Sequence, residues 1–350
     1  MKSMHTRWMG VVGLGLALGV AGCSDDGHDD HDNHDHDAAV VDAGPVDAPL
    51  ADAGPGETLT IPFRAVVGTE PFQCGRVYTG LGSQMSRWNP LDFRFYVHDL
   101  RLVTPGGEVP LTVVDEEIWQ RDGAALLDFE DRTGQCSNGT APTNTSVRVR
   151  LPAGASATGA TGLRFTLGLP FAINHRNAST SPSPFNLTSM WWNWQGGYKF
   201  LRVDGRIEDA MGAPVVPSWN IHLGSTGCDG NAMGNVTTCT QPNRVSVSLE
   251  GFNPMRSVVV ADLAALVQGA DLSRSQMPAA GCMSGADDPD CPPIFSALGL
   301  RGAGAQQPLP AQFLPGVGAD EITQVTLDLL QRLVLDAQGQ LRLSIGQKTV

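Results

Sequence analysis

Three histidines are the residues of the folded part of this sequence that are best suited to binding a metal. After residue 56 the chain contains His98, His175 and His222 and no other histidine. Neutral imidazole is the commonest nitrogen ligand in proteins and suits copper, zinc, iron and nickel, whereas calcium and magnesium prefer oxygen. A single histidine in a strand is more often a structural residue than a ligand. Residue type therefore makes these three candidates and does not choose among them.

A cluster of tryptophans raises a second chemical question. In the stretch "SMWWNWQGGYKF" a strand would place Met190, Trp192 and Trp194 on one face. Trp191 and Asn193 would lie on the other face. Such aromatic side chains commonly fill a β core. Intact indole offers only an N–H donor and is a poor metal ligand, so a metal-binding role for a tryptophan here would require chemical modification.

Other motifs give weaker signals. The sequence contains no G-x-S-x-G elbow and no H-E-x-x-H helix, so it gives no support to a hydrolase of those types. The run "GADDPDC" carries Asp287, Asp288 and Asp290, which could bind calcium. A solvated turn is the better interpretation, because an EF-hand loop would also need its glycine and distal glutamate.

The N-terminus has the features of an export signal. Lys2 and Arg7 precede an apolar run that is too short to span a bilayer comfortably, and small residues lead to Cys23 in "VAGC". This ending resembles a bacterial lipobox, which predicts a lipoprotein signal peptide over residues 1–22 and lipidation of Cys23. A plain secretory signal with an unrelated cysteine is the alternative. We therefore expect a lipid-anchored protein of a bacterial cell envelope, on the periplasmic side or the outer surface.

The remaining cysteines predict disulfides. An exported chain meets an oxidising compartment, and six cysteines remain when Cys23 is set aside. Six cysteines allow 15 connectivities, and the sequence does not choose among them. The simplest arrangement pairs the cysteines that lie close together in the sequence, which gives two disulfides and leaves the other two cysteines to form the third. These pairs are Cys228 with Cys239, Cys282 with Cys291, and Cys74 with Cys136.

Residues 23–56 are expected to form a disordered tether. They are rich in Asp, His, Ala and Pro and contain no aromatic residue, so they cannot bury a core. The histidines of "HDDHDNHDHD" could gather divalent metal weakly, although a charged spacer is the simpler interpretation. Ten of the 36 acidic residues lie between Asp25 and Asp52, so much of the net charge of −13 belongs to the tether. The chain presents no basic excess, which argues against nucleic-acid binding.

Residues 57–350 are expected to form one all-β domain. Stretches that alternate apolar and polar residues recur between Gly- and Pro-rich turns, for example "TLTIPFRAVVG", "LDFRFYVHDLRLV" and "NRVSVSLEGF". In the second stretch Phe93, Phe95 and Val97 share one face, and Tyr96 and His98 share the other. Many short strands must pair sheets to bury such faces. We predict a single β-sandwich-like domain with long loops, stapled by disulfides and preceded by the tether.

The ordered series of motifs resembles one protein family. The motifs are "FRFYVHDLRL", "LLDFEDRTGQC", "GLPFAINH", "MWWNWQGGYKFLRVDG", "IHLGSTGC" and "GCMSGADDPDC". Together they are similar to the MbnP-like family of exported proteins, also described as the four-Cys partner of a "metallo-mystery pair". The resemblance covers about residues 57–300, and the role of residues 301–350 stays open.

The resemblance implies a modified copper site. In that family a partner related to MauG and di-haem cytochrome c peroxidases oxidises a tryptophan to kynurenine, and the product binds copper with help from histidine. Carried onto this sequence, the pattern implies His175 and His222 as ligands of one copper ion, with His98 as a weaker third. Trp192 or Trp194 would be the kynurenine precursor, and both stay open.

Three functions therefore follow from the sequence. The first is an exported, lipid-anchored copper-binding protein without turnover of its own, which handles copper in the envelope by storage, delivery or sensing. The second is a secreted copper-dependent oxidase or a hydrolase with an unrecognised site. The third is a disulfide-stapled binding module with the tryptophan strand as an aromatic platform for sugar or protein.

Overall fold

The computed structural model describes residues 56–301, except residues 117, 231–234 and 276–278, and four later strands. All of these residues belong to the compact unit Ala51–Val350. The expected signal peptide, the lipidation of Cys23 and nearly all of the expected tether lie outside the described residues. Within the described part of the chain, no helix combines the length and the hydropathy that a bilayer span requires.

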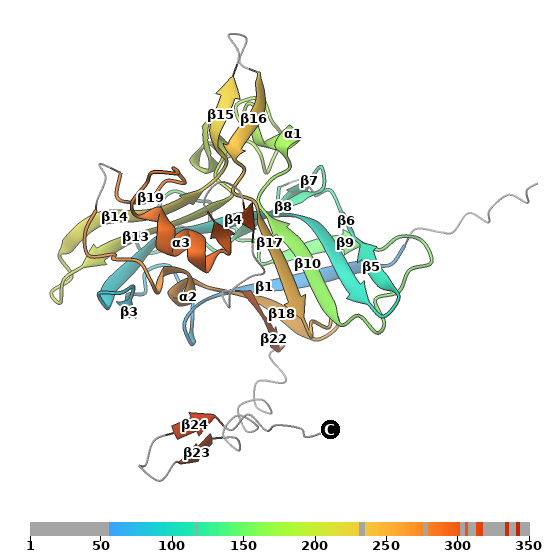
Figure 1. Ribbon diagram of the computed structural model, residues 1–350, viewed down its shortest axis with the longest axis horizontal. Coiled ribbons are helices and arrows are strands. Elements are labelled where there is room, and N and C mark those ends of the chain that lie inside the picture. Colours follow the sequence, from blue (N-terminus) through green and yellow to red (C-terminus); the bar gives the residue numbers. More distant parts are fainter. Residues whose placement is uncertain are drawn as a thin grey trace, which may run out of the picture. The chain divides into compact units, whose positions relative to one another are not determined.

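Two sheets make up the architecture (Figure 1). The larger, ten-stranded sheet has the order β17-β10-β4-β13-β14-β19, with β3, β5, β8 and β7 joined to it beside β4. Its strands are β3 (Tyr78–Leu81), β4 (Ser86–Thr104), β5 (Gly107–Pro110), β7 (Gln120–Arg121), β8 (Ala124–Asp128), β10 (Gly162–Leu167), β13 (Leu201–Glu208), β14 (Pro214–Leu223), β17 (Val245–Glu250) and β19 (Gly281–Cys282).

The smaller, six-stranded sheet has the order β22-β18-β1-β9-β6, with β2 beside β1. Its strands are β1 (Thr58–Val67), β2 (Glu70–Pro71), β6 (Thr112–Val113), β9 (Ser146–Arg150), β18 (Ser257–Asp262) and β22 (Phe313–Val317). Four hairpins lie outside the two sheets: β11 (Trp191–Asn193) with β12 (Gly197–Tyr198), β15 (Thr226–Gly230) with β16 (Val236–Gln241), β20 (Leu300–Arg301) with β21 (Ala305–Gln306), and β23 (Leu333–Leu335) with β24 (Leu341–Leu343).

The helices are short. They are α1 (Phe171–Asn174), the 3₁₀ turn η1 (Thr188–Met190), α2 (Leu263–Val267) and α3 (Cys291–Ala297). The expected passage from a strand into a helix in "SVVVADLAALVQG" is confirmed by β18 and α2. Asp262 caps α2 by accepting a hydrogen bond from the N–H of Ala264, because its carboxylate satisfies a backbone donor that the helix leaves open.

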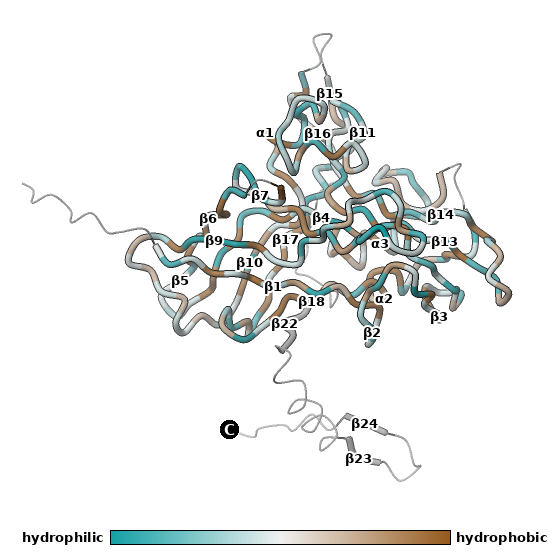
Figure 2. The backbone as a smooth tube through the Cα atoms, turned by 180° about the vertical axis from the view of Figure 1, so that it is seen from behind, coloured by the Kyte–Doolittle hydropathy of each residue, from teal (hydrophilic) through white to brown (hydrophobic). Residues whose placement is uncertain are grey.

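The hydrophobic core lies between the two sheets. Along β1 the odd-numbered residues from Leu59 to Val67 are buried, as the alternation of the sequence predicts. The ring of Phe63 on β1 lies 6.2 Å from that of Phe95 on β4 and 5.7 Å from that of Phe165 on β10, both in edge-to-face contact. These ring contacts join the inner face of the six-stranded sheet to the inner face of the ten-stranded sheet, so the predicted β-sandwich-like fold is confirmed. The hydropathy of the trace in Figure 2 changes from residue to residue along these strands.

The long strand β4 is buried on both faces. Phe93, Phe95 and Val97 face the core as predicted, but Tyr96 on the opposite face is also fully buried. The ring of Tyr96 stacks on Phe185, and its hydroxyl donates to a backbone carbonyl in the loop that precedes η1. The loop between α1 and η1 therefore covers the outer face of the ten-stranded sheet at Tyr96.

Three disulfides staple the domain: Cys74–Cys136, Cys228–Cys239 and Cys282–Cys291. The pairing that short spacing favoured is confirmed. The acidic turn between Cys282 and Cys291 is held by its own hydrogen bonds, because Asp288 accepts the N–H groups of Met283 and Asp290.

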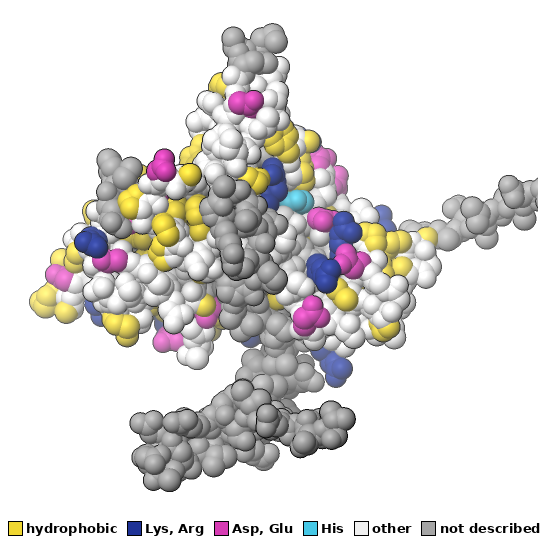
Figure 3. All heavy atoms as spheres, viewed as in Figure 1, with side chains coloured by type: hydrophobic (Ala, Val, Ile, Leu, Met, Phe, Trp, Pro, Cys, Tyr) yellow, Lys and Arg dark blue, Asp and Glu magenta, His cyan; other side chains and the backbone are white. Residues whose placement is uncertain are grey.

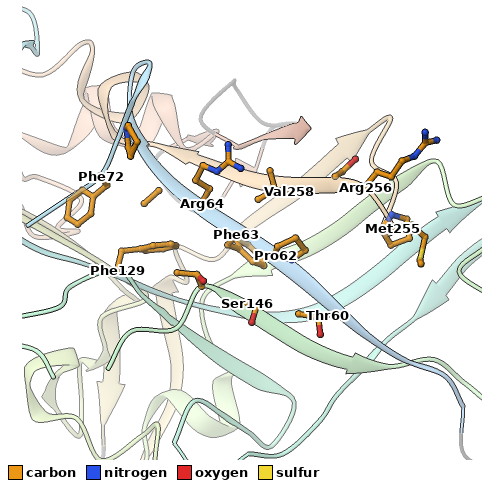
Figure 4. Close-up of a pocket in the computed structure, with 15 residues that line it drawn as sticks. Thr60, Pro62, Phe63, Arg64, Phe72, Phe129, Ser146, Met255, Arg256 and Val258 are labelled. Atoms are coloured by element: carbon orange, nitrogen blue, oxygen red, sulfur yellow. The ribbon is translucent and has the colours of Figure 1, made fainter. Parts of the chain in front are cut away.

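A groove of about 810 Å³ crosses β1 on the side of the smaller sheet. Figure 4 shows Phe72, Phe129 and Phe63 along it and Arg64 and Arg256 at its edge. Its lining contains no histidine and no tryptophan, so it is separate from the candidate metal ligands. The face of the molecule in Figure 3 carries positive and negative side chains interspersed among the described residues, without a broad basic patch.

Candidate metal centre

His175 lies at the end of α1, against two hairpins. Its Nδ1 is 3.2 Å from the carbonyl oxygen of Trp194. A carbonyl can only accept, so Nδ1 carries the proton and the lone pair belongs to Nε2. Nε2 lies 3.2 Å from the side-chain amide of Asn174 and 3.5 Å from the sulfur of Cys239. Figures 1 and 2 show α1 beside the hairpin β15–β16.

The tryptophan segment forms a tight hairpin rather than a long strand. Met190 ends the 3₁₀ turn and Trp194 lies in the turn after β11, so the predicted strand from Met190 to Trp194 was too long. The reason is local: the side chain of Asn193 accepts the N–H groups of Gln195 and Gly196, which closes the turn.

Gly197 fixes the end of this turn beside α1. It has a φ of +75°, and a Cβ there would lie 2.4 Å from the carbonyl oxygen of Asn174. The Asn174 side chain also accepts the N–H of Tyr198. Only glycine fits this approach, so the residue before His175 and the tryptophan hairpin are locked together.

The three indoles occupy different places. Trp192 packs over Gly224, where a Cβ would lie 2.5 Å from its ring, and Trp194 packs over Gly230, where a Cβ would lie 2.7 Å from its ring. Trp191 packs against the core, and its buried Nε1 has no hydrogen-bond partner in the described structure. The predicted separation of Trp192 and Trp194 from Trp191 agrees with these contacts. Met190, predicted on the Trp192 face, is instead fully buried in the core, and Asn193, predicted on the Trp191 face, is exposed.

A cavity of about 380 Å³ opens beside this cluster. Its lining includes Trp192, Gln195, Cys228 and Met283. The Gln195 side chain donates to the carbonyl of Cys228 at 2.9 Å, which ties the tryptophan hairpin to β15. The cavity therefore gives solutes access to Trp192 and lies beside Cys228 of the Cys228–Cys239 disulfide.

His222 is held by a buried carboxylate. Its Nε2 lies 2.8 Å from Asp204 on the neighbouring strand β13, so Nε2 donates and the lone pair belongs to Nδ1. A carboxylate that orients an imidazole in this way is the usual partner of a histidine that binds metal. Burial alone would raise the pKa of Asp204, but the hydrogen bond from His222 and the charge of Arg202 hold it below its ordinary value.

Asp204 belongs to a chain of buried charges. Arg202 contacts Asp204 at 2.7 Å and Asp92 at 3.1 Å, and Asp92 accepts a hydrogen bond from Arg94 at 2.8 Å. Arg94 lies opposite Arg202 in the sheet register, and Asp92 lies opposite Asp204. Since like charges face each other across the strands, the attractions run along each strand and along the diagonal.

Two further carboxyl groups lie near Arg94. Asp128 and Glu130 are fully buried, and one oxygen of each has no hydrogen-bond partner in the described structure. Burial raises the pKa of Asp128 to about 7, although the charge of Arg94 opposes the shift. Burial also raises the pKa of Glu130.

His98 has a hydrogen-bond partner that it shares with neither His175 nor His222. Its Nδ1 is 2.9 Å from the carbonyl oxygen of Gly168. Burial lowers the pKa of all three histidines: the Gly168 carbonyl opposes the shift at His98, the Trp194 carbonyl at His175 and Asp204 at His222. Each imidazole is therefore neutral at pH 7, the form in which it can bind a metal.

Among the described residues, two groups of three or more His, Cys, Asp or Glu have ligand atoms within 4.8 Å of one another. One joins His175 to Cys228 and Cys239, and the other joins Glu130 to Cys74 and Cys136. Neither includes His222 or His98. The structure thus brings His175 to the tryptophan hairpin and a disulfide, and holds His222 by a separate carboxylate network.

Comparison with known proteins identifies the family. The family model named MbnP matches residues 56–284. The chain belongs to the MbnP family. Among solved structures it is similar to MbnP from Methylosinus trichosporium, with 31% sequence identity and a TM-score of 0.65, over 75% of this chain and 99% of that chain. A search of curated proteins gave no match.

The part that matches the MbnP model contains all three candidate histidines, the tryptophan hairpin and the Cys228–Cys239 disulfide. It also contains residues that the sequence-based prediction missed, above all Asp204, Asn174 and Gln195. For Asp204 a signal was present. Arg202 and Asp204, like Asp92 and Arg94, are opposite charges two residues apart, which share one face of a strand.

Proposed function

We propose that this protein binds one copper ion in the cell envelope and that its site matures by oxidation of Trp192 or Trp194 to kynurenine. A partner related to MauG and di-haem cytochrome c peroxidases would perform that oxidation. The chain itself would have no catalytic turnover. Membership of the MbnP family supports the proposal, and the hydrogen bond between His175 and the Trp194 carbonyl is the observation that carries it.

The donor chemistry of the histidines fits copper. Each imidazole uses one nitrogen to donate to an oxygen, His175 to the Trp194 carbonyl and His222 to Asp204. The remaining lone pairs, on Nε2 of His175 and Nδ1 of His222, are the donors that a copper ion would take. The amide of Asn174 now faces Nε2 of His175 and would have to yield. His98 is the weaker third candidate.

The tryptophan modification would add a donor that indole lacks. One molecule of dioxygen, or two of hydrogen peroxide with release of two waters, would cleave the C2–C3 bond of the indole and insert two oxygen atoms, and hydrolysis would then release C2 as formate. The products are a ketone and an aryl amine, whose nitrogen lone pair is available. Trp194 lies in the hairpin turn and is 39% exposed, whereas Trp192 lines the cavity. Both positions are open to an external oxidant.

The cellular setting follows from the N-terminus. The proposed anchor is the lipid on Cys23 after removal of residues 1–22, and the tether would separate the domain from the membrane. Storage, delivery and sensing of copper all remain compatible with this arrangement.

Mass spectrometry of the protein from its native host tests the modification. Kynurenine adds about 4 Da to a tryptophan, so fragment ions of the peptide with Trp191, Trp192 and Trp194 name the modified residue. We expect the shift on Trp192 or Trp194 and not on Trp191. Three unmodified tryptophans in native protein would contradict the proposal and would favour a binding module with an aromatic platform.

Copper stoichiometry tests the ligands. We expect one copper per chain after co-expression with the haem partner, and loss of that copper in His175→Ala and in His222→Ala. His98→Ala tests the weaker third candidate, whose half-buried imidazole lies outside the His175 group, and unchanged copper binding would exclude it as a ligand. Full copper binding by both of the first two variants would rule out the assigned ligands.

A further inference from the structure

We propose that Cys228, Cys239 and His175 form a second, thiol-dependent binding site for a soft metal ion. The site would open only when the Cys228–Cys239 disulfide is reduced. It does not depend on the proposed copper function, because it uses no modified tryptophan and no ligand from His222.

The geometry of the three side chains supports the site. Cys228 and Cys239 lie directly opposite each other on β15 and β16, and their sulfurs lie within 4.8 Å of a ring nitrogen of His175. The distance between the Cys239 sulfur and Nε2 of His175 is 3.5 Å. On a tetrahedral ion with a metal–sulfur bond of about 2.3 Å and a metal–nitrogen bond of about 2.0 Å, sulfur and nitrogen are roughly 3.5 Å apart. The nitrogen thus already stands at the spacing of a ligand pair.

The orientation of His175 is also suitable. The Trp194 carbonyl accepts a hydrogen bond from Nδ1, so the lone pair of the ring is on Nε2, the atom that faces Cys239. Thiolate sulfur together with imidazole nitrogen favours Cu(I), Zn²⁺ and the zinc substitute Co²⁺ over calcium or magnesium.

The disulfide is accessible to a reductant. Cys239 is half-buried, and its bonded partner Cys228 belongs to the lining of the cavity of about 380 Å³. In the Cys282–Cys291 pair both cysteines are buried, and in the Cys74–Cys136 pair Cys136 is buried. A small dithiol should therefore reduce the Cys228–Cys239 bond before the other two, since exchange requires direct attack on a sulfur atom.

The reaction balances with a dithiol as the reductant. One thiolate of the reductant attacks a sulfur of the Cys228–Cys239 bond and forms a mixed disulfide, and its second thiol displaces the cysteine and closes a ring. Two electrons pass to the protein, which gains two protons as two thiols, and the reductant becomes a cyclic disulfide. A bound metal ion then replaces those two protons. Because His175 serves both sites, reduction would remove it from the proposed copper site.

Cobalt binding to the full chain tests this proposal. The protein is produced without the haem partner, treated briefly with dithiothreitol, freed of it without air, and titrated with Co²⁺ alone. We expect one Co²⁺ per chain with a near-ultraviolet thiolate-to-cobalt band, and no such band in the oxidised protein. The histidines and aspartates of the tether cannot give a thiolate band. Peptide mapping with an alkylating reagent should place the free thiols on Cys228 and Cys239.

Variants separate the roles. The double variant Cys228→Ser, Cys239→Ser should lose the band. His175→Ala should keep both thiols and bind Co²⁺ at least about tenfold more weakly, because loss even of an outer-shell partner commonly costs that much. Asp99→Asn, which changes an exposed charge outside the His175 group, is the control and should bind as the wild type does. Reduction of another disulfide first, or equal binding by His175→Ala, would overturn the proposal, whereas the copper function would still stand.

Discussion

The surroundings of His222 and His175 differ in what holds each imidazole. His222 lies on a ten-residue strand, and the carboxylate of Asp204 belongs to a row of buried charges on the same sheet. His175 follows a helix of four residues, and its partners are a backbone carbonyl, an amide and a disulfide. The first position is therefore fixed by the sheet and by charge. The second depends on how two hairpins meet, so covalent chemistry in either hairpin can alter it.

The largest loss of stability is expected from a substitution that breaks the carboxylate network. Asp204→Asn removes the charged acceptor of His222 and leaves Arg202 with Asp92 as its remaining carboxylate partner in a buried place, which should cost about 3–5 kcal/mol of unfolding free energy. Urea denaturation measures the loss. The control Asp99→Asn removes an exposed partner of Arg101 and should cost less than about 1 kcal/mol. Equal losses would mean that the network does not hold the sheet more firmly than a surface pair.

The second effect concerns pH. Asp128 has a pKa raised to about 7, so the folded state binds more protons than the unfolded state between about pH 4 and 7. Its contribution to stability is therefore lost as the pH rises through this window. Asp128→Asn should flatten that decline and stabilise the protein at pH 8 by up to roughly 4 kcal/mol. Denaturation curves from pH 4 to 8 measure this, and parallel profiles for both proteins would refute it.

A third test compares the supports of two indoles. Gly224→Ala places a methyl group 2.5 Å from the Trp192 ring and 2.7 Å from the carbonyl of Tyr198, so it should cost about 1–3 kcal/mol. Gly230→Ala meets only Trp194, a partly exposed ring that can move, and should cost less than about 1 kcal/mol. Thermal denaturation and tryptophan fluorescence follow both. Gly106→Ala, whose Cβ would meet only the Thr104 hydroxyl oxygen at an ordinary contact distance of 3.7 Å, is the control, and a reversed order would contradict the assigned contacts.

The smallest losses of stability are expected when each of the two histidines is itself replaced. His222→Ala removes a hydrogen bond from a buried carboxylate and should cost about 1–2 kcal/mol. His175→Ala removes a 3.2 Å contact with a backbone carbonyl in a half-buried place and should cost about 0.5 kcal/mol. Urea denaturation of metal-free protein gives both values. A larger loss at His175 would show that the imidazole itself holds the hairpins together.

The sequence predicts the fold well where a strand packs only one of its two faces against the core. The alternation of Leu59, Ile61 and Phe63 identifies the inner face of β1 because the other residues of that strand lie nearer to solvent. Short spacing also gave the correct disulfides. Cys228 and Cys239 are close in sequence because they occupy one hairpin, where strand pairing brings their sulfurs together.

The outer face of β4 could not be interpreted in the same way. Asp92 and Arg94 look like solvent-facing residues of an alternating strand, yet they are fully buried. Tyr96 on the same face is covered by the distant loop that carries Phe185, and alternation within a strand contains no information about such a cover. The contact of His175 with Cys239 was hidden for a similar reason, because it joins two segments that are far apart in the chain.

The parallel pairing of β1 with β18 bears on how the domain folds. Phe63 at the start of the domain aligns with Val259 near its end, so the six-stranded sheet cannot close until most of the chain is present. Contacts between such distant segments require a costly loop closure before they stabilise anything, and domains built from them fold slowly. The domain should therefore form only after most of the chain has been made available, with its hydrophobic strands exposed to other proteins until β18 joins β1.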